Sequence, residues 1–389
     1  MRIDKNYILW ALISVPILVG VFLIIRQFIF FGVIPEKGVS PEKGVRPLFL
    51  QEKGSDPFLK NPPDIIKAVY FTSTTGGNKK SIDHLIELAN KSELNAVIID
   101  IKDFSGYVAY NSGIPDVQKY KAEKFYIKDI DGLIKKLHDN NIYVIARITV
   151  FQDPVLARAR PDWAVKNKYT GGPWADNKGL SWIDPACREC WGYYAAIAKD
   201  AIGRGFDEIN FDYIRFPSDG NMEALVFSYW DRLTPRPKIL NEFYKYMRGE
   251  LGDAKMSADL FGFVTTRTED FGVGQVMEDA FEYFDFISPM VYPSHYPNTF
   301  LGFANPAAHP YEVIYHTMKS ARERLEKFYQ ATGNTRAKIR PWLQDFDLGA
   351  DYTEAMVRAE IKATQDALGE HYKGFMIWNA RNVYHEGVF

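Results

Sequence analysis

The stretch GFDEINFDYIRFPSDG, residues 205–220, has the pattern of a short buried strand that runs into a loop. Side chains alternate along a strand, so Ile209, Phe211 and Tyr213 are expected on one face. Asp212 then lies on the opposite face. A purely structural strand keeps its buried polar groups few, because each must be paired or costs free energy. The kind of sheet to which this strand belongs therefore decides what the carboxylate does.

Strand and helix patterns alternate along the chain from residue 67 to its end. Apolar, β-branched runs alternate with seven amphipathic helix patterns, which is typical of a parallel sheet. Eight such units in this length favour a closed (β/α)8 TIM barrel over an open doubly wound sheet. No helix pattern follows the last strand. The strand patterns cover residues 67–73, 95–103, 142–150, 207–213, 254–263, 285–293, 337–346 and 374–382.

The segment before the barrel predicts a membrane anchor and a tether. Residues 1–6 form a short tail, and residues 7–30 are predicted to be a transmembrane signal anchor, because Tyr7–Ile25 carries no charge and is about long enough to span a bilayer. Residues 31–63 repeat the motif PEKGV and have the composition of a flexible linker. The barrel domain is expected over 64–389. Flanking charges do not decide the orientation; we expect a single-pass protein of the cell membrane with its barrel outside the cytoplasm.

Composition excludes few classes of function. The 389 residues are 47% apolar and have a net charge of −2, so nothing indicates nucleic-acid binding. No phosphate-loop spacing and no HExxH motif occur, and no cofactor and no metal are expected. The CxxC pair Cys187 and Cys190 lacks the further ligands of a zinc site. It is interpreted as a structural pair, joined as a local disulfide if the domain is extracellular.

The chemistry predicted for the barrel rests on carboxylates at the carboxyl ends of strands, where barrel enzymes carry their sites. Glycoside cleavage uses two carboxyl groups on either side of the scissile bond. Asp212 and Asp259, on neighbouring strands, are predicted to be nucleophile or stabiliser and general acid/base respectively. Arg147 either keeps Asp212 ionised or forms a purely structural ion pair. Polar and aromatic residues expected to bind substrate at the same end are Asp100, Lys102, Asp103, Arg147, Asn210, Arg215, Tyr292, Trp342, Gln344, Asp345, Trp378 and Asn379.

Rival assignments remain open at this point. Asp100, Asp103 and Asp345 compete with Asp259 for the role of second carboxylate. Each aromatic residue of the set is as compatible with packing at the barrel mouth as with sugar stacking. Arg215 is expected either to orient its loop or to bind substrate.

The motifs NAVIIDIKD, IARITVFQDP, INFDYIRFPSDG, SADLFG and ISPMVYPSHY together resemble a family of bacterial glycoside hydrolases with a (β/α)8 barrel, distantly similar to the α-amylase superfamily. The resemblance covers residues 69–381, and FDYIRFP is its most distinctive part. It implies a secreted or membrane-tethered hydrolase of polysaccharides, with Asp212 as the leading catalytic carboxylate. The chain departs from the amylase pattern at Asn210, where that pattern has arginine, and at Asp259, where it has glutamate.

Two functions follow from these expectations. The first is a membrane-anchored glycoside hydrolase that cleaves a cell-wall, capsular or other extracellular polysaccharide by carboxylate acid/base chemistry. The alternative is a non-catalytic carbohydrate-binding barrel that organises the envelope. A barrel lyase that uses Asp103 or Asp345 as its base is a third interpretation.

Overall fold

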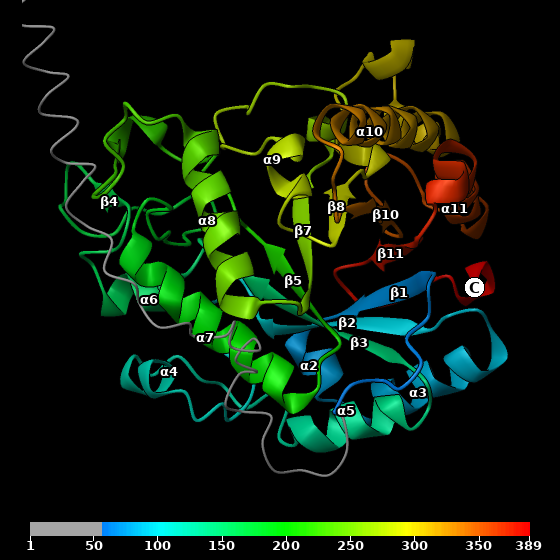
Figure 1. Cartoon of the computed structure of the whole chain (residues 1–389), viewed down its shortest axis with the longest axis horizontal. Coiled ribbons are helices and arrows are strands. Elements are labelled where there is room, and N and C mark those ends of the chain that lie inside the picture. Colours follow the sequence, from blue (N-terminus) through cyan, green and yellow to red (C-terminus); the bar gives the residue numbers. More distant parts are fainter. Residues whose placement is uncertain (1–56) are drawn as a thin grey trace, which may run out of the picture. The chain divides into compact units, whose positions relative to one another are not determined.

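A computed structural model describes residues 57–389, which form a closed parallel barrel (Figure 1). The sheet closes because the seventh strand position pairs with β8 on one side and with β11 on the other. That position is divided in two by Pro341, which has no N–H to give to a ladder. The strands are β1 (Ile66–Phe71), β2 (Ala96–Lys102), β3 (Tyr143–Thr149), β5 (Glu208–Asp212), β7 (Lys255–Phe261), β8 (Phe286–Met290), β9 (Lys338–Ile339) with β10 (Trp342–Gln344), and β11 (Gly374–Trp378).

Helices surround the strands, as Figure 1 shows. The ring consists of α3 (Lys79–Lys91), α5 (Ile130–His138), α7 (Arg188–Arg204), α8 (Arg236–Leu251), the short α9 (Met277–Phe281), α10 (Pro310–Thr332) and α11 (Glu354–Leu368). Shorter helices lie in the loops: α2 (Ser73–Gly76), α4 (Pro115–Lys119) and α6 (Pro154–Ala159). The (β/α)8 barrel expected from the sequence is therefore confirmed.

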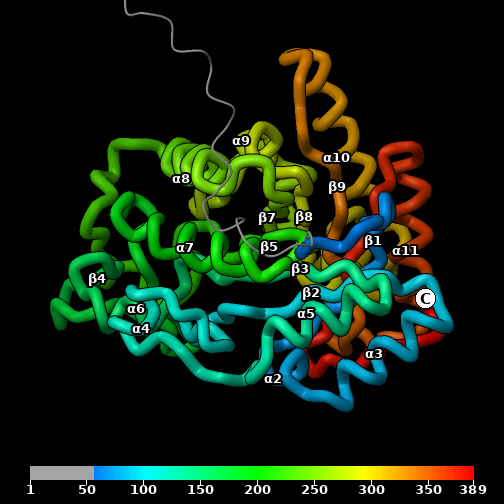
Figure 2. Tube along the Cα trace, turned by 60° about the horizontal axis from the view of Figure 1, so that its bottom comes forward, coloured from blue at the N-terminus to red at the C-terminus, as the bar shows by residue number. Residues whose placement is uncertain are grey.

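A short segment after β11 packs against the helices on either side of it. A single 3-10 turn, Glu386–Val388, packs beside α11, and Val388 is buried. The carboxylate of Glu386 lies 2.5 Å from Nε2 of His84 on α3. Figure 2 shows the C-terminus between α3 and α11, so this short segment contacts both helices.

The core has two layers because strand side chains alternate. Val97 and Ile99 point outward and pack in the large layer between the strands and helices. Ala96 and Ile98 point inward and belong to the smaller cluster inside the barrel. Asp100 continues the inner face one step further toward the carboxyl end, which places its side chain above the apolar filling of the barrel.

Two long excursions extend the carboxyl end of the barrel. The loop after β3 carries β4 (Lys166–Asn167), and the loop after β5 carries β6 (Leu225–Val226). These two segments pair as a small antiparallel sheet. Because they are joined, the loops that follow β3 and β5 form one continuous wall on that side of the barrel mouth.

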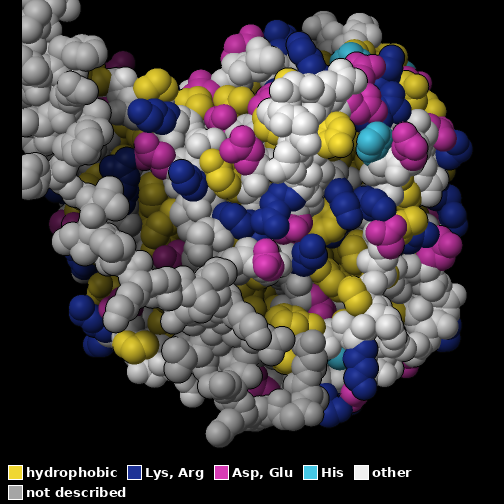
Figure 3. Space-filling model, viewed as in Figure 1, with side chains coloured by type: hydrophobic (Ala, Val, Ile, Leu, Met, Phe, Trp, Pro, Cys, Tyr) yellow, Lys and Arg dark blue, Asp and Glu magenta, His cyan; other side chains and the backbone are white. Residues whose placement is uncertain are grey.

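The predicted anchor, residues 7–30, and most of the predicted linker lie outside the described residues. Within residues 57–389, no helix combines the length and apolar character needed to cross a bilayer. Cys187 and Cys190 are both buried, and their thiols are not joined. The pair is therefore two buried free thiols at the start of α7, without the local disulfide that the sequence allowed. Figure 3 shows acidic and basic side chains interspersed over the face seen in Figure 1.

Candidate active site

A cleft of about 450 Å³ opens at the carboxyl ends of the strands. Asp212 and Asp259 are the two carboxylates among the described residues that line it. Both were predicted from the sequence to be the catalytic pair. The remaining lining residues are Arg147, Lys178, Tyr213, Arg215, Phe261, Gly262, Phe263, Met290, Tyr292, His295, Trp342 and Trp378.

Asp212 ends β5 and is held as an acceptor. One of its oxygens accepts a hydrogen bond from the backbone N–H of Tyr213 at 2.5 Å, and the other is paired with Arg147. Tyr213 has a φ of +53°, in the left-handed region that costs a non-glycine residue about 1 kcal/mol or more. The strand therefore ends abruptly. Both Asp212 and Tyr213 line the cleft, which corrects the expectation that Tyr213 shares a face with Ile209 and Phe211.

Asp259 lies on β7 in a different environment. Its Oδ1 accepts hydrogen bonds from Nε1 of Trp342 at 2.7 Å and from Nδ2 of Asn210 at 2.8 Å. Its Oδ2 is enclosed and has no hydrogen-bond partner among the described residues. Burial, and second the charge of Asp212, raise the pKa of Asp259 to about 8. At neutral pH this carboxyl group therefore carries a proton.

Arg147 on β3 connects the carboxylates. Its Nη1 lies 2.5 Å from Oδ1 of Asp100, its Nη2 contacts Asp212, and its Nε lies 3.6 Å from Oδ2 of Asp259. Burial alone lowers the pKa of Arg147, but Asp100 and Asp212 outweigh it and hold that pKa well above its usual value. The guanidinium is thus permanently charged and forms an ion pair with Asp212.

Asp100 supports Arg147 from below the cleft. It accepts a hydrogen bond from the hydroxyl of Tyr70 at 2.5 Å, and it is fully enclosed. Burial raises the pKa of Asp100 despite the nearby guanidinium. Asp100 is not among the lining residues, so its rivalry with Asp259 for direct contact with substrate has no geometric support.

An aromatic wall faces the two aspartates. The ring centroids of Trp378 and Tyr292 lie 5.7 Å apart with an interplanar angle of 32°, and Phe346 stands edge-on to Trp378 at 5.0 Å. Tyr70 lies 6.3 Å from both Trp342 and Trp378. Apolar sugar faces pack on such rings. Trp342 also donates a hydrogen bond, because its indole N–H points to Oδ1 of Asp259.

Lys102 points away from the cleft. The register between β2 and β3 shifts between Asp100 and Lys102, and this irregularity turns Lys102 to the outer face although it lies two residues beyond Asp100. Its Nζ lies 2.9 Å from Oδ2 of Asp153 and donates to the carbonyl of Thr149. The pair with Asp153 is fully enclosed and ties β2 to the start of α6.

The other predicted polar residues hold loops together. Asp103 accepts hydrogen bonds from the backbone and hydroxyl of Ser105 in a tight turn. Gln344 links Ser294 to Phe346, and Asp345 is paired with His385 at 2.6 Å. Asn379 donates to the carbonyls of Asp345 and Val383. With Asn210, which supports Asp259, these residues lie outside the lining of the cleft.

Several lining residues were not anticipated from the sequence. Lys178 comes from the loop after β3, and His295 comes from the loop after β8, where burial lowers its pKa. Gly262 follows β7, and a Cβ there would lie 2.5 Å from the carbonyl oxygen of Met290. The two backbone segments therefore approach more closely than alanine allows. The glycine in the motif LFGF could have indicated the close approach at Gly262. No sequence pattern indicates that Lys178 and His295 line the cleft.

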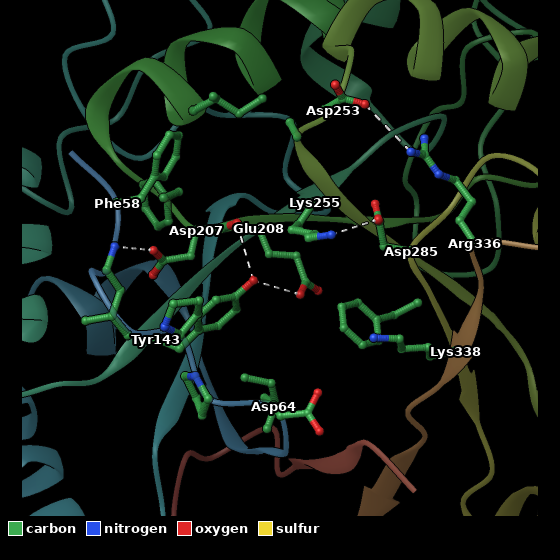
Figure 4. A pocket seen from close by; sticks show the side chains of 18 residues that line it. Phe58, Asp64, Tyr143, Asp207, Glu208, Asp253, Lys255, Asp285, Arg336 and Lys338 are labelled. Carbon is green, nitrogen blue, oxygen red and sulfur yellow. Dashed lines mark hydrogen bonds and ion pairs between the residues drawn. The ribbon is translucent and has the colours of Figure 1, made fainter. Parts of the chain in front are cut away.

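A second cavity, of about 660 Å³, lies at the opposite end of the barrel (Figure 4). Two pairs of its charged side chains contact each other: Figure 4 shows Lys255 directed at Asp285 and Arg336 directed at Asp253. This end carries the amino termini of the strands, where barrel folds place stability and not catalysis. Within residues 57–389, no group of three or more His, Cys, Asp or Glu side chains is arranged to hold a metal ion.

Residues 68–384 match the family described as "putative glycosyl hydrolase domain". The chain belongs to this family. The match covers most of the chain and nearly all of the barrel, from within β1 to beyond β11, so it confirms the family and the kind of enzyme that the sequence motifs predicted. No curated protein matches this chain.

Solved structures with a similar fold include a hypothetical protein from Ruminiclostridium thermocellum, 43% identical over 49% of this chain and 96% of its own, with a TM-score of 0.46. An α-galactosidase from Thermus thermophilus is 11% identical over 85% of this chain and 64% of its own, with a TM-score of 0.48. A spore cortex-lytic enzyme from Bacillus cereus is 10% identical over 84% of this chain and 74% of its own, also with a TM-score of 0.48. The chain thus spans less than two thirds of the α-galactosidase.

Proposed function

We propose that this protein is a membrane-anchored glycoside hydrolase that cleaves a cell-wall, capsular or other extracellular polysaccharide, with Asp212 and Asp259 as its catalytic pair. The observation that carries the proposal is the difference between the two carboxyl groups that line the cleft. One forms an ion pair with Arg147, and the other is enclosed and has a pKa raised to about 8. Two neighbouring carboxyl groups in such different surroundings are typical of an acid and its partner.

The reaction follows from these protonation states. Asp259 donates its proton to the glycosidic oxygen as the bond to the anomeric carbon breaks, so the leaving sugar departs as an alcohol. Asp212, paired with Arg147, attacks the anomeric carbon or stabilises the positive charge that develops there. Water supplies the new hydroxyl group, and the proton that water releases returns to Asp259, which is thereby restored to its starting state, while Asp212 is left as the carboxylate that it was. The net change is the addition of one water across one glycosidic bond.

Arg147 distinguishes the surroundings of the two groups. It pairs closely with Asp212 and Asp100, whereas its Nε lies 3.6 Å from Oδ2 of Asp259. The aromatic wall of Trp378 and Tyr292 provides a surface for sugar rings beside the pair. The predicted anchor and linker, residues 7–63, would hold the barrel at the membrane, outside the cytoplasm, within reach of envelope glycans.

The test compares full-length wild type with Asp212→Asn and with the control Asp253→Asn, an exposed carboxylate at the opposite end of the barrel. Each is incubated with bacterial wall and capsular glycans, and released oligosaccharides are identified by mass spectrometry. We expect release by wild type and the control, and a loss of at least about 10³-fold for Asp212→Asn.

Equal release by Asp212→Asn would remove Asp212 from the mechanism. Retention of glycan by wild type without any release would replace the hydrolase with the carbohydrate-binding barrel. Membrane placement is tested separately: the full chain is expected in the membrane fraction, with its barrel open to protease added outside the cell.

A further inference from the structure

Arg215 is a buried cation at the edge of the cleft that the hydrolytic mechanism does not use. It lies in the loop directly after β5 and is 9% exposed, yet it lines the cleft beside Asp212 and Tyr213. The backbone around it is fixed, because the N–H of Phe216 donates to the carbonyl of Val273, and Gln275 donates to the carbonyl of Ile214. The guanidinium therefore has a defined position.

Aromatic rings hold this guanidinium in place. Its central carbon lies 4.8 Å from the ring centroids of Trp182 and Phe261 and 5.0 Å from that of Tyr213. Cation–π contact of this kind offsets part of the cost of removing an arginine from water. Burial lowers the pKa of Arg215, although not enough for an arginine to lose its proton near neutral pH.

The guanidinium has unused donors. Nη1 donates to the carbonyl of Phe216 at 3.0 Å and to the hydroxyl of Ser218 at 3.1 Å. Within residues 57–389, Nε and Nη2 have no hydrogen-bond partner, and neither is an enclosed atom. Nor does Arg215 form an ion pair with any described carboxylate, in contrast to Arg147 and the enclosed Arg340. Two adjacent open N–H groups on one arginine form the fork that fits a carboxylate.

The charges around Arg215 leave it available to a ligand. Asp176, a carboxylate of the long loop whose charge acts on Arg215, already accepts hydrogen bonds from Gln152, Trp182 and two backbone N–H groups. Asp212 is occupied by Arg147, and Asp219 is partly exposed on the loop beyond. Lys178, an exposed cation, lines the same cleft and adds a second positive charge.

From this arrangement we infer that Arg215, with Lys178, forms a subsite for a sugar that carries a carboxylate, so that the polysaccharide cleaved beside Asp212 is acidic. The inference rests on the proposed hydrolase function and names its substrate class. A neutral sugar offers hydroxyl oxygens to the two open N–H groups but no opposite charge, whereas the carboxylate of a uronic acid or a lactyl-substituted sugar accepts from both and also neutralises the guanidinium. The aromatic rings of Trp378 and Tyr292, which line the same cleft, then pack against the apolar faces of the sugar rings in the polysaccharide.

The test uses full-length protein and matched pairs of glycans: polygalacturonate, hyaluronan and peptidoglycan glycan strands, each native and with its carboxyl groups chemically reduced to alcohols. Wild type, Arg215→Gln, Arg215→Lys and Lys178→Gln are compared with Arg158→Gln, an exposed arginine of α6 outside the cleft. Both kcat/KM and binding by affinity electrophoresis are measured. Folding of each variant is checked by thermal denaturation.

Arg215→Gln is expected to lose about 10- to 100-fold on a native acidic glycan and less than about 2-fold on its reduced form. Arg215→Lys keeps the charge without the fork and is expected to fall between. Lys178→Gln, whose side chain is exposed and whose loss does not endanger folding, is expected to lose about 2- to 5-fold on the acidic form alone.

The outcomes separate the two proposals. Equal effects on native and reduced glycans, or a wild type that prefers the reduced form, would overturn the acidic subsite while the hydrolase stands. Arg215-dependent binding of acidic glycans without turnover would keep the subsite and overturn the hydrolase. No binding and no turnover with any pair would overturn both.

Discussion

Replacement of Asp259 by asparagine is expected to make the folded protein more stable at neutral pH, while it abolishes turnover. The unfolded chain ionises this carboxyl near its ordinary value of 3.8, whereas the folded protein keeps the proton up to about pH 8. Between those values the folded state binds more protons than the unfolded state, so stability falls as pH rises. Asparagine imitates the protonated acid, because its oxygen still accepts from Trp342 and Asn210.

The magnitude follows from the distance between the two pKa values. The gap of roughly three pH units between 3.8 and 7, at about 1.4 kcal/mol for each unit, amounts to about 4 kcal/mol at pH 7. The free energy of unfolding of Asp259→Asn minus that of wild type is therefore expected near zero at pH 4. It grows by about 1.4 kcal/mol for each pH unit and levels off near pH 8.

Urea unfolding from pH 5 to pH 8 measures this difference, with Asp253→Asn as the control whose difference from wild type stays flat. When both proteins also carry Asp212→Asn, the difference in their free energies of unfolding is expected to level off at a lower pH. The reason is that the charge of Asp212 is one cause of the raised pKa of Asp259. If Asp259 were instead an ionised partner of Arg147, its loss would destabilise the protein by about 3–5 kcal/mol without this pH dependence. That result would refute the assignment of Asp259 as the acid.

Three further outcomes are expected. The kcat/KM of wild type falls above about pH 8, as Asp259 loses the proton it donates; a profile that already falls near pH 5 would contradict this role. Trp378→Ala raises KM for oligosaccharides about 10-fold, since it removes half of the stack with Tyr292, whereas Trp378→Phe keeps most of the affinity; equal KM values in both variants would refute a stacking role. Lys102→Met lowers the free energy of unfolding by about 3–5 kcal/mol, because it leaves Asp153 enclosed without its ion-pair partner. The double variant Lys102→Met/Asp153→Asn is expected to recover part of that loss. Kinetics on the folded fraction should show unchanged activity per folded molecule.

The amino-acid sequence by itself determined the periodic part of this protein. Alternation of apolar residues is a local property of strands, so the eight barrel strands and the inward direction of Arg147, Asp212 and Asp259 could be predicted before any contact was known. The parallel order of the strands then places their carboxyl ends together, which brings the two aspartates to one cleft. The same motifs also predicted a glycoside hydrolase family, and the match of residues 68–384 to such a family confirms it.

Only the tertiary structure decided what breaks that periodicity. The irregularity between β2 and β3 turns Lys102 outward, and the left-handed backbone of Tyr213 directs its ring into the cleft; each depends on partners distant in the chain. The paths of the long loops, which bring Lys178 and His295 to the lining, have no repeating pattern that a sequence could reveal. The raised pKa of Asp259 belongs to the same class, because burial and the nearby charge of Asp212 exist only once β5 and β7 are paired in the closed barrel.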